Sequence, residues 1–386
     1  MTLTISKIVS IQVNLDEISI EQADVWMKDV EEKLSEALRE VGKEMIGEAF
    51  QGIINSKAPK RGVKEWVSKW VKTLWGDIKL FFPRPRNRAF PKLRIPSSTP
   101  GVSSLVLKMC AIKPFRQSER IIKETQGIRI PRSTLWKRFQ EQAESLPELP
   151  DVEPCPSEAV VISADGTMFS LQNGYKAEAK IALAYTERKD RTLLNKVVYA
   201  SAEPAETFNA KASELIRRKY SVDMNTKGVV IGDGASWITS LRDNYFPQMR
   251  LQLDVVHVLR KAGEFLPRFS NEMRAAIMGR LKMFIGIGNW ELFRGLMVNL
   301  TKASPNQDAF WDWLLFVKRR WHELTSFIGQ RGPLAERTSS PCEKYVDLLI
   351  VRRLNVPGAS WSLRGADNML RVRNYFFNKE DNHNQT

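Results

Sequence analysis

The sequence predicts an α/β domain that carries a helical insertion and follows a mainly helical, basic region. From residue 159 onward, short apolar runs typical of buried strands alternate with helical patterns, and such alternation is typical of a mixed α/β sheet. Before that point, apolar residues recur mostly at helical spacing. Prolines and acidic residues at 147–158 predict a linker between the two parts.

The charge of the chain favours a polyanionic partner. Its 386 residues carry a formal net charge of +15, and a surface of that sign attracts nucleic acid. The cysteines Cys110, Cys155 and Cys342 form no CxxC pair, so neither a zinc ribbon nor a disulfide framework is predicted, and a reducing compartment is favoured. No apolar run is long enough for a signal peptide or a membrane span. We therefore expect a cytoplasmic protein without membrane contact.

Residues 1–56 are predicted to form a long amphipathic helix for packing or dimerisation. Ser19 and Gln22 match a capping box. Apolar residues then recur at helical spacing to about Phe50.

Residues 57–94 combine basic and aromatic side chains. Twelve lysines and arginines are opposed only by Glu65 and Asp77, and six aromatic residues are interleaved with them. Basic side chains neutralise phosphates, while aromatic rings stack on bases or pack in a core. Prolines exclude a long helix here, and Leu74 to Phe82 is expected to form a hairpin strand. A solvated basic arm is the alternative to nucleic-acid contact.

Residues 121–136 have the pattern of a helix-turn-helix. Gly127 falls in the turn, Ile128 and Ile130 can seal the helix pair, and a second helix begins near Pro131. Plain helical packing remains an equal alternative. We expect nine basic residues of region 57–146 to contact DNA: Lys60, Arg61, Arg84, Arg86, Arg88, Arg129, Arg132, Lys137 and Arg138.

Two aspartates are candidate catalytic groups. Asp165 and Asp233 each follow a short apolar strand and precede a glycine. Ligands of open α/β sheets bind at the carboxyl ends of strands, and glycine permits a close approach. The alternative is that each Asp-Gly marks an ordinary turn.

A third carboxylate is expected from the C-terminal part of the chain. Two-metal cleavage of a phosphodiester needs several carboxylates around Mg²⁺ or Mn²⁺. Glu343 lies in the first turn of a helix predicted from Ser340 or Pro341 to Leu354, and Asp347 follows it on the same face. A first-turn glutamate is also favoured by the helix dipole alone.

Asp254 and His257 are candidate accessory residues. They are predicted to lie on or just after a strand at 251–256. The pair could bind a metal or orient DNA, and His257 could equally be a satisfied core histidine.

In this order, the motifs resemble those of bacterial insertion-sequence transposases with a Mutator-like DDE (RNase H-like) catalytic domain. The resemblance covers about residues 159–377. The matching blocks are Ala-Asp-Gly-Thr (164–167), Gly-Asp-Gly-Ala-Ser-Trp-Ile (232–238), Leu-Asp-Val-Val-His-Val (253–258), Cys-Glu-Lys-Tyr-Val (342–346) and Trp-Ser-Leu-Arg-Gly-Ala-Asp-Asn-Met-Leu-Arg-Val-Arg (361–373).

The resemblance implies a catalytic role for Asp165, Asp233 and Glu343 as ligands of Mg²⁺ or Mn²⁺. It implies accessory positions for Asp254 and His257, and a family insertion in the helical stretch before residue 339. The basic N-terminal half resembles the end-binding region of such enzymes, although this chain lacks the cysteines that some relatives carry there.

We therefore expect a metal-dependent polynucleotidyl transferase that binds element ends, cleaves DNA and joins 3′-hydroxyl ends to a target. Its partners are element and target DNA and further copies of itself, and it is expected in the cytoplasm with the nucleoid. The alternatives are an RNase H-like nuclease without strand transfer and a degenerate transposase that only binds DNA. The expected segments are 1–56, 57–146, 147–158 (linker), 159–264, 265–338 (helical insertion), 339–377 and 378–386 (polar tail).

Overall fold

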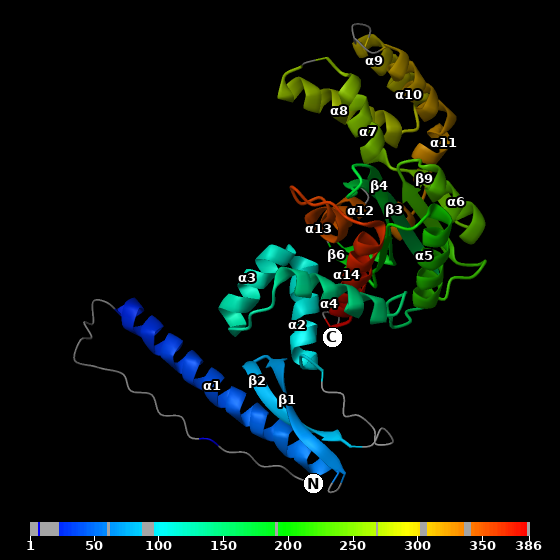
Figure 1. The fold of residues 1–386 in the computed structure, drawn as a ribbon. Coiled ribbons are helices and arrows are strands. Elements are labelled where there is room, and N and C mark those ends of the chain that lie inside the picture. Colours follow the sequence, from blue (N-terminus) through cyan, green and yellow to red (C-terminus); the bar gives the residue numbers. More distant parts are fainter. Residues whose placement is uncertain are drawn as a thin grey trace. The chain divides into compact units, whose positions relative to one another are not determined.

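The computed structural model describes residues 7, 23–59, 62–86, 96–189, 192–267, 269–301, 307–335 and 341–383. The chain forms two compact units, Met1–Gln142 and Ala143–Thr386 (Figure 1). Their boundary falls shortly before the predicted linker. In the described part of the chain, no helix combines the length and the apolar character needed to cross a bilayer.

Some predicted features lie outside the described residues. These are the capping box at Ser19–Gln22 and the predicted DNA contacts Lys60, Arg61 and Arg88.

The N-terminal unit begins with a long helix packed against a β-hairpin. α1 (Ala23–Lys57) contacts β2 (Gly76–Pro85), which pairs antiparallel with β1 (Val63–Thr73). The helix continues past the end expected near Phe50. The hairpin also contains a first strand that the sequence analysis did not predict, because charged and aromatic residues hide its alternation.

Three further helices complete this unit. They are α2 (Pro100–Ile112), α3 (Phe115–Gln126) and α4 (Arg132–Ser145), the last of which crosses the unit boundary. Gly127 ends α3 in the left-handed conformation, at φ 65°. Ile128 and Ile130 of the connection are buried, and the two predicted helices are present on either side of the turn at Gly127.

The second unit is a mixed α/β domain built on a five-stranded sheet of order β7-β4-β3-β8-β9. β7, β4 and β3 pair antiparallel, whereas β8 and β9 add on in parallel. The strands are β3 (Ala159–Ser170), β4 (Lys176–Tyr185), β7 (Val197–Ser201), β8 (Lys227–Gly232) and β9 (Arg250–Leu253), and β5 (Glu187–Lys189) and β6 (Thr192–Leu194) form a small separate hairpin.

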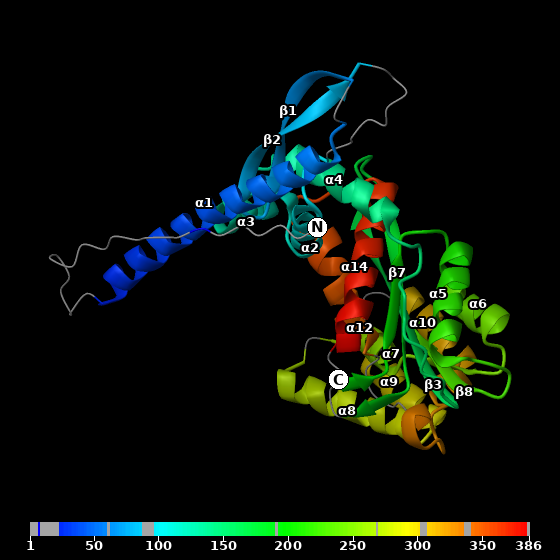
Figure 2. The same cartoon turned by 90° about the horizontal axis from the view of Figure 1, so that it is seen from below.

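Helices cover both faces of this sheet. α5 (Ala205–Tyr220) and α6 (Ser236–Tyr245) lie on one face, and α12 (Cys342–Val346) and α14 (Leu363–His383) lie on the other side (Figure 2). Phe208 of α5 and Trp237 of α6 belong to the same buried cluster as strand residues from all five strands.

A helical excursion separates β9 from α12, as expected. It contains α7 (Val255–Phe265), α8 (Asn271–Gly286), α9 (Trp290–Thr301), α10 (Gln307–Arg319), α11 (Trp321–Leu324) and the short 3₁₀ turn η2 (Gly332–Ala335). These helices bury their own aromatic core, which includes Phe293, Phe310 and Trp313. The excursion is therefore a folded layer rather than a loop.

α14 protects the edge strand β7. Oδ1 of Asn374 accepts a hydrogen bond from Ala200 N, and its Nδ2 donates to Ala200 O. Asn378 makes the same two bonds with Val198. The prediction of a polar tail from residue 378 is wrong on this point, because Asn378 is buried and the helix continues to His383.

We predict that Asn374→Leu lowers the free energy of unfolding by about 1–3 kcal/mol, because it leaves two buried backbone groups without partners. Urea unfolding of the full chain measures this change. The control Lys379→Met alters an exposed position on the same helix and is expected to change stability by less than about 0.5 kcal/mol. Equal midpoints for Asn374→Leu and wild type would contradict the assigned role.

Candidate active site

Three acidic residues align across the carboxyl edge of the sheet. Asp165 lies in β3, Asp233 follows β8 and Asp254 follows β9. The parallel registers pair Ser163 with Ile231 and Gly232 with Leu253. Continued along the strands, the same registers set Asp165 beside Asp233, and Asp233 beside Asp254. Neighbouring strands are about 4.8 Å apart, so these three side chains lie close together although they are distant in sequence. We call Asp165, Asp233 and Asp254 the acidic row.

Asp165 occupies a regular strand rather than a strand end. The sequence analysis expected the strand to end there, but β3 continues to Ser170 because it keeps pairing antiparallel with β4 after its pairing with β8 stops. Ile162 and Ala164 face the core under α5 and α6, so Asp165 points to the opposite face. It is 8% exposed, and its Oδ1 accepts a hydrogen bond of 2.8 Å from Gly166 N.

Asp233 begins the turn between β8 and α6. Its Oδ1 accepts a hydrogen bond of 2.9 Å from Ala235 N, and the residue is exposed. Gly234 has a φ of 98°, a conformation that strongly favours glycine. The Asp-Gly pair therefore forms a turn and also presents a carboxylate at the sheet edge.

Asp254 and His257 lie at the start of a helix. The strand predicted at 251–256 is shorter than expected, because Asp254 caps α7 by accepting a hydrogen bond of 2.8 Å from Val256 N. Asp254 Oδ2 lies 3.3 Å from His257 Nδ1, and His257 Nε2 lies 3.9 Å from Asp165 Oδ2. His257 thus lies between the carboxylates of Asp254 and Asp165.

Burial and charge give Asp165 unusual electrostatics. The pKa of Asp165 is raised to about 6, mainly by burial and also by the negative charges of Asp233 and Asp254, while His257 and the hydrogen bond from Gly166 N act to lower it. The Asp254 carboxylate, 3.3 Å from His257 Nδ1, raises the pKa of His257. The carboxylates therefore interact electrostatically, and a cation among them would stabilise their charged forms.

Glu343 lies on a helix that contacts the same strand. The adjacent residue, Cys342, is fully buried, and its Sγ lies 3.4 Å from Ser163 O. Burial, with Asp165 and Asp254 nearby, raises the pKa of Cys342. Glu343 itself is exposed, and its Oε1 lies 3.3 Å from Arg260 Nη1 on α7. The first turn of α12 therefore lies beside the row of acids, with Glu343 held by an arginine.

Asp347 is not brought to the row of acids by any contact in the described residues. It begins a π-helical turn, η3 (Asp347–Val351), and its Oδ2 lies 2.8 Å from Arg352 Nε. This turn replaces the regular helix predicted to continue to Leu354. Arg373 supports it by donating hydrogen bonds to the carbonyls of Leu348 and Leu349, and burial lowers the pKa of Arg373 to about 10.

Arg353 is a structural residue. It is 3% exposed, and its guanidinium lies 5.1 Å from the ring centroid of Trp361. Its guanidinium is thus packed in the interior against Trp361 rather than exposed to a phosphate.

The sequence analysis missed Arg320, which holds the Asp233 turn. Its Nη1 donates a hydrogen bond of 2.8 Å to Gly234 O, and its Nε is 2.7 Å from Glu323 Oε2. A Cβ on Gly234 would lie 2.5 Å from this guanidinium and 2.8 Å from the Phe316 ring. The helical excursion thus packs directly against the residue that follows Asp233.

The predicted DNA-binding residues of the N-terminal unit are dispersed over its surface. Arg129, Arg132 and Lys137 are exposed at and after the helix–turn–helix connection. Arg138 is half-buried and donates a hydrogen bond to Ser97 Oγ. On the hairpin, Arg86 is exposed. Arg84 is also exposed and forms an ion pair with Glu65 at 3.0 Å.

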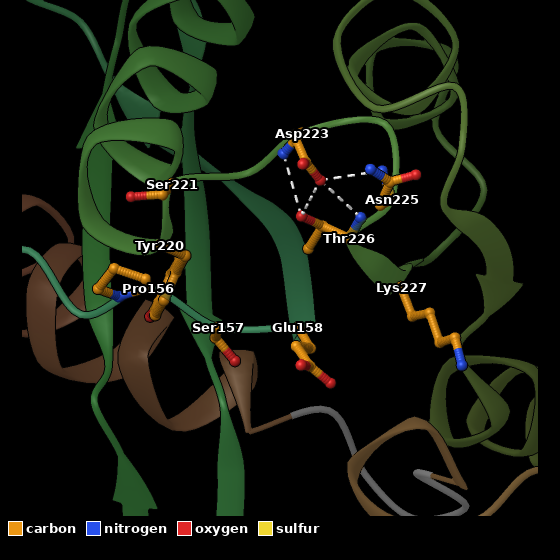
Figure 3. A pocket seen from close by; sticks show the side chains of 9 residues that line it. All are labelled: Pro156, Ser157, Glu158, Tyr220, Ser221, Asp223, Asn225, Thr226 and Lys227. Carbon is orange, nitrogen blue, oxygen red and sulfur yellow. Dashed lines mark hydrogen bonds between the residues drawn. The ribbon is translucent and has the colours of Figure 1, made fainter.

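A separate pocket lies at the other end of the strands. Its volume is about 420 Å³, and it is lined by residues before β3 and at the start of β8, including Glu158, Tyr220 and Lys227 (Figure 3). Asp223 in this pocket already accepts hydrogen bonds from Thr226 and the Asn225 amide. Parallel strands place this pocket at the sheet edge opposite to Asp165 and Asp233.

The acidic row has the oxygen donors that hard divalent cations prefer. Among the residues that the structure describes, however, no three His, Cys, Asp or Glu side chains converge closely enough to hold a metal ion. The donor chemistry of these side chains therefore suits Mg²⁺ or Mn²⁺, although their arrangement in the described residues is not that of a metal site.

We predict that Arg320→Met loosens the Asp233 turn. Loss of a charged hydrogen bond to Gly234 O should speed amide exchange at residues 233–236 by about tenfold, as measured by hydrogen–deuterium exchange. Arg319→Met, an exposed change in the neighbouring residue, serves as the control. Unchanged exchange in this turn, or an equal increase throughout α10, would exclude a specific positioning role.

The comparisons with known proteins identify one matching family model. It is described as an uncharacterised protein family, UPF0236, and it matches residues 156–282. This segment includes Asp165, Asp233, Asp254 and His257 but ends well before Glu343. No curated protein matches the chain. The family match therefore covers the strands that bear the acidic row and adds no activity of its own.

Proposed function

We propose that this protein is a DNA transposase whose catalytic carboxylates are Asp165, Asp233 and Glu343. The observation that carries the proposal is the strand register, which aligns Asp165 with Asp233 at one edge of the sheet. The first turn of α12, which bears Glu343, lies beside the same strand. We therefore assign these three acidic residues, which are distant in the sequence, to one catalytic site.

The architecture supports this proposal. A mixed sheet with helices on both sides is compatible with the RNase H-like domain that the sequence resemblance implies. The folded helical layer between β9 and α12 corresponds to the insertion expected before the glutamate. The basic N-terminal unit, with its helix–turn–helix, is suited to bind element ends.

Asp165, Asp233 and Glu343 would hold Mg²⁺ or Mn²⁺, which would activate water or a 3′-hydroxyl and stabilise the leaving oxygen. Asp254 orients His257 through its Nδ1, and His257 Nε2 faces Asp165. The pair therefore restricts the position of the Asp165 carboxylate. Arg260 keeps the Glu343 side chain near α7, and Arg320 holds the turn that carries Asp233.

The proposed partners are DNA and further copies of the chain. Exposed Arg129, Arg132 and Lys137 would contact duplex phosphates or base edges. Transposition joins two element ends, so the active complex is proposed to contain more than one copy of the chain. The protein would act on chromosomal DNA in the cytoplasm, associated with the nucleoid.

We predict that Asp233→Asn lowers Mg²⁺-dependent cleavage of element-end DNA by at least about 100-fold. Residues that only support metal ligands already contribute 10- to 100-fold, so loss of a direct ligand should cost at least as much. Asp243→Asn, an exposed change on α6, is the matched control. A gel assay of end cleavage with and without a chelator measures both.

Cleavage that survives Asp233→Asn would remove Asp233 from the catalytic set. Wild-type cleavage without joining of the cut ends to a target plasmid would instead favour a nuclease. DNA binding without any metal-dependent cleavage would favour a degenerate transposase.

Glu343→Gln tests the third carboxylate separately. We predict a similar loss of cleavage with a change in unfolding free energy below about 1 kcal/mol. The Arg260–Glu343 pair is solvent-exposed, with side-chain exposures of 56% and 59%, and such pairs contribute little to stability. The control Glu291→Gln removes a comparable exposed ion pair with Arg294 in the helical layer. Full cleavage by Glu343→Gln would contradict the assignment.

A further inference from the structure

The β1–β2 hairpin has one face packed on α1 and one face exposed. Alternate residues of a strand share a face, and so do residues directly opposite each other. The register pairs Trp66 with Pro83, Ser68 with Phe81, and Trp70 with Lys79. Five of these residues are exposed and form one surface, which we call the ribbon face: Trp66, Ser68, Trp70, Lys79 and Phe81. Pro83, at the end of this face, is buried.

The aromatic residues of the ribbon face are not needed to build the core. Trp66, Trp70 and Phe81 are 49%, 61% and 45% exposed. On the opposite face, Val71 and Leu80 are 2% exposed and pack with Ile54 of α1. Three large exposed aromatic side chains on one short hairpin indicate a binding surface.

The charge of the hairpin indicates what binds there. Lys79 Nζ lies 6.0 Å from the Trp70 ring centroid and 5.6 Å from that of Phe81. Both carboxylates of the hairpin are already engaged, Asp77 with Lys72 at 2.9 Å and Glu65 with Arg84 at 3.0 Å. A cation among aromatic rings complements a ligand that has both flat rings and negative charge.

We propose that the ribbon face binds unpaired DNA, with bases stacked on Trp66, Trp70 and Phe81 and a phosphate near Lys79. The choice of DNA rests on the proposed function, because cutting and joining expose single-stranded segments. In a duplex, neighbouring base pairs cover the flat faces of the bases, so only unpaired bases offer them to a side chain. This surface is distinct from the helix–turn–helix, which is suited to a duplex groove.

The geometry suits a single strand. Trp66 and Trp70 are four residues apart on β1, a distance of about 13 Å along the strand. That separation is compatible with stacking on bases a few nucleotides apart. Gln51 of α1 fixes the position of Phe81, since its side chain accepts from Phe81 N and donates to Phe81 O, each at 2.8 Å. A rigid platform of this kind loses little conformational entropy on binding.

The experiment measures binding by the full chain to a 5′-labelled oligothymidylate of about 15 nucleotides and to a duplex of equal length. Fluorescence anisotropy in a chelator keeps cleavage out of the measurement. We expect Trp70→Ala to weaken single-strand binding about tenfold and Trp66→Ala/Trp70→Ala to weaken it further, with duplex binding nearly unchanged. Trp70→Phe retains an aromatic ring and should restore most of the affinity.

The matched control is Trp311→Ala, which removes an equally exposed tryptophan on α10 and should leave both affinities unchanged. Far-UV circular dichroism verifies that each variant is folded. Single-strand affinity that is unchanged in the folded double variant overturns the proposal. An equal loss of duplex affinity also overturns it. If the double variant instead loses self-association while its single-strand affinity is intact, the ribbon face is a protein interface and the proposal is also wrong.

The binding experiment can be interpreted whether or not the proposed catalytic function is correct. The two proposals are measured on different variants and with different readouts, because the acidic row is not part of the ribbon face. If Asp233→Asn still cleaves DNA while Trp70→Ala loses single-strand affinity, the catalytic assignment fails and the ribbon face stands. If Asp233→Asn abolishes cleavage while Trp70→Ala keeps its single-strand affinity, only the ribbon-face proposal is rejected.

Discussion

The parallel pairing of β8 with β3 is the constraint on which the candidate site depends. Because both strands run in the same direction, the residues of β3 that follow their paired segment lie level with the residues that follow β8. The register then sets Asp165 level with Asp233, and the addition of β9 brings Asp254 into the same row. A shift of one residue in either register would turn the following side chains to the other face and disperse the row.

Much of this arrangement is local enough to be predicted from the sequence. Apolar runs predicted β3 and β8, and the glycine after each aspartate indicated a turn or a close approach. The true extent of β3 was not predictable from Asp165 and Gly166, because it depends on pairing with β4. The cap that Asp254 provides was also missed, since its strand and helix adjoin without a loop. Arg320 gave no sequence signal, because its partner Gly234 lies 86 positions earlier in the chain.

The edge strands β2 and β7, which belong to different sheets, are protected in the same way. Gln51 bonds both backbone groups of Phe81, and Asn374 and Asn378 do the same for Ala200 and Val198. In each case an amide side chain on a helix supplies one donor and one acceptor to one residue of an edge strand. Such capping satisfies buried groups and blocks pairing with another chain. The sequence does not reveal it, because an asparagine in a helix is usually a solvated residue.

The acidic row is not expected to increase the free energy of unfolding. Burial of Asp165 disfavours its charged form, and Asp233 and Asp254 repel it, while His257 and the hydrogen bond from Gly166 N oppose these effects. Replacing the carboxylate with an apolar group would remove these unfavourable terms, so stability alone does not explain its presence. Other acidic side chains form ion pairs, as Glu323 does with Arg320 at 2.7 Å. The concentration of acidic side chains at the sheet edge is therefore a candidate functional feature, and the cation that we propose there would compensate its negative charge.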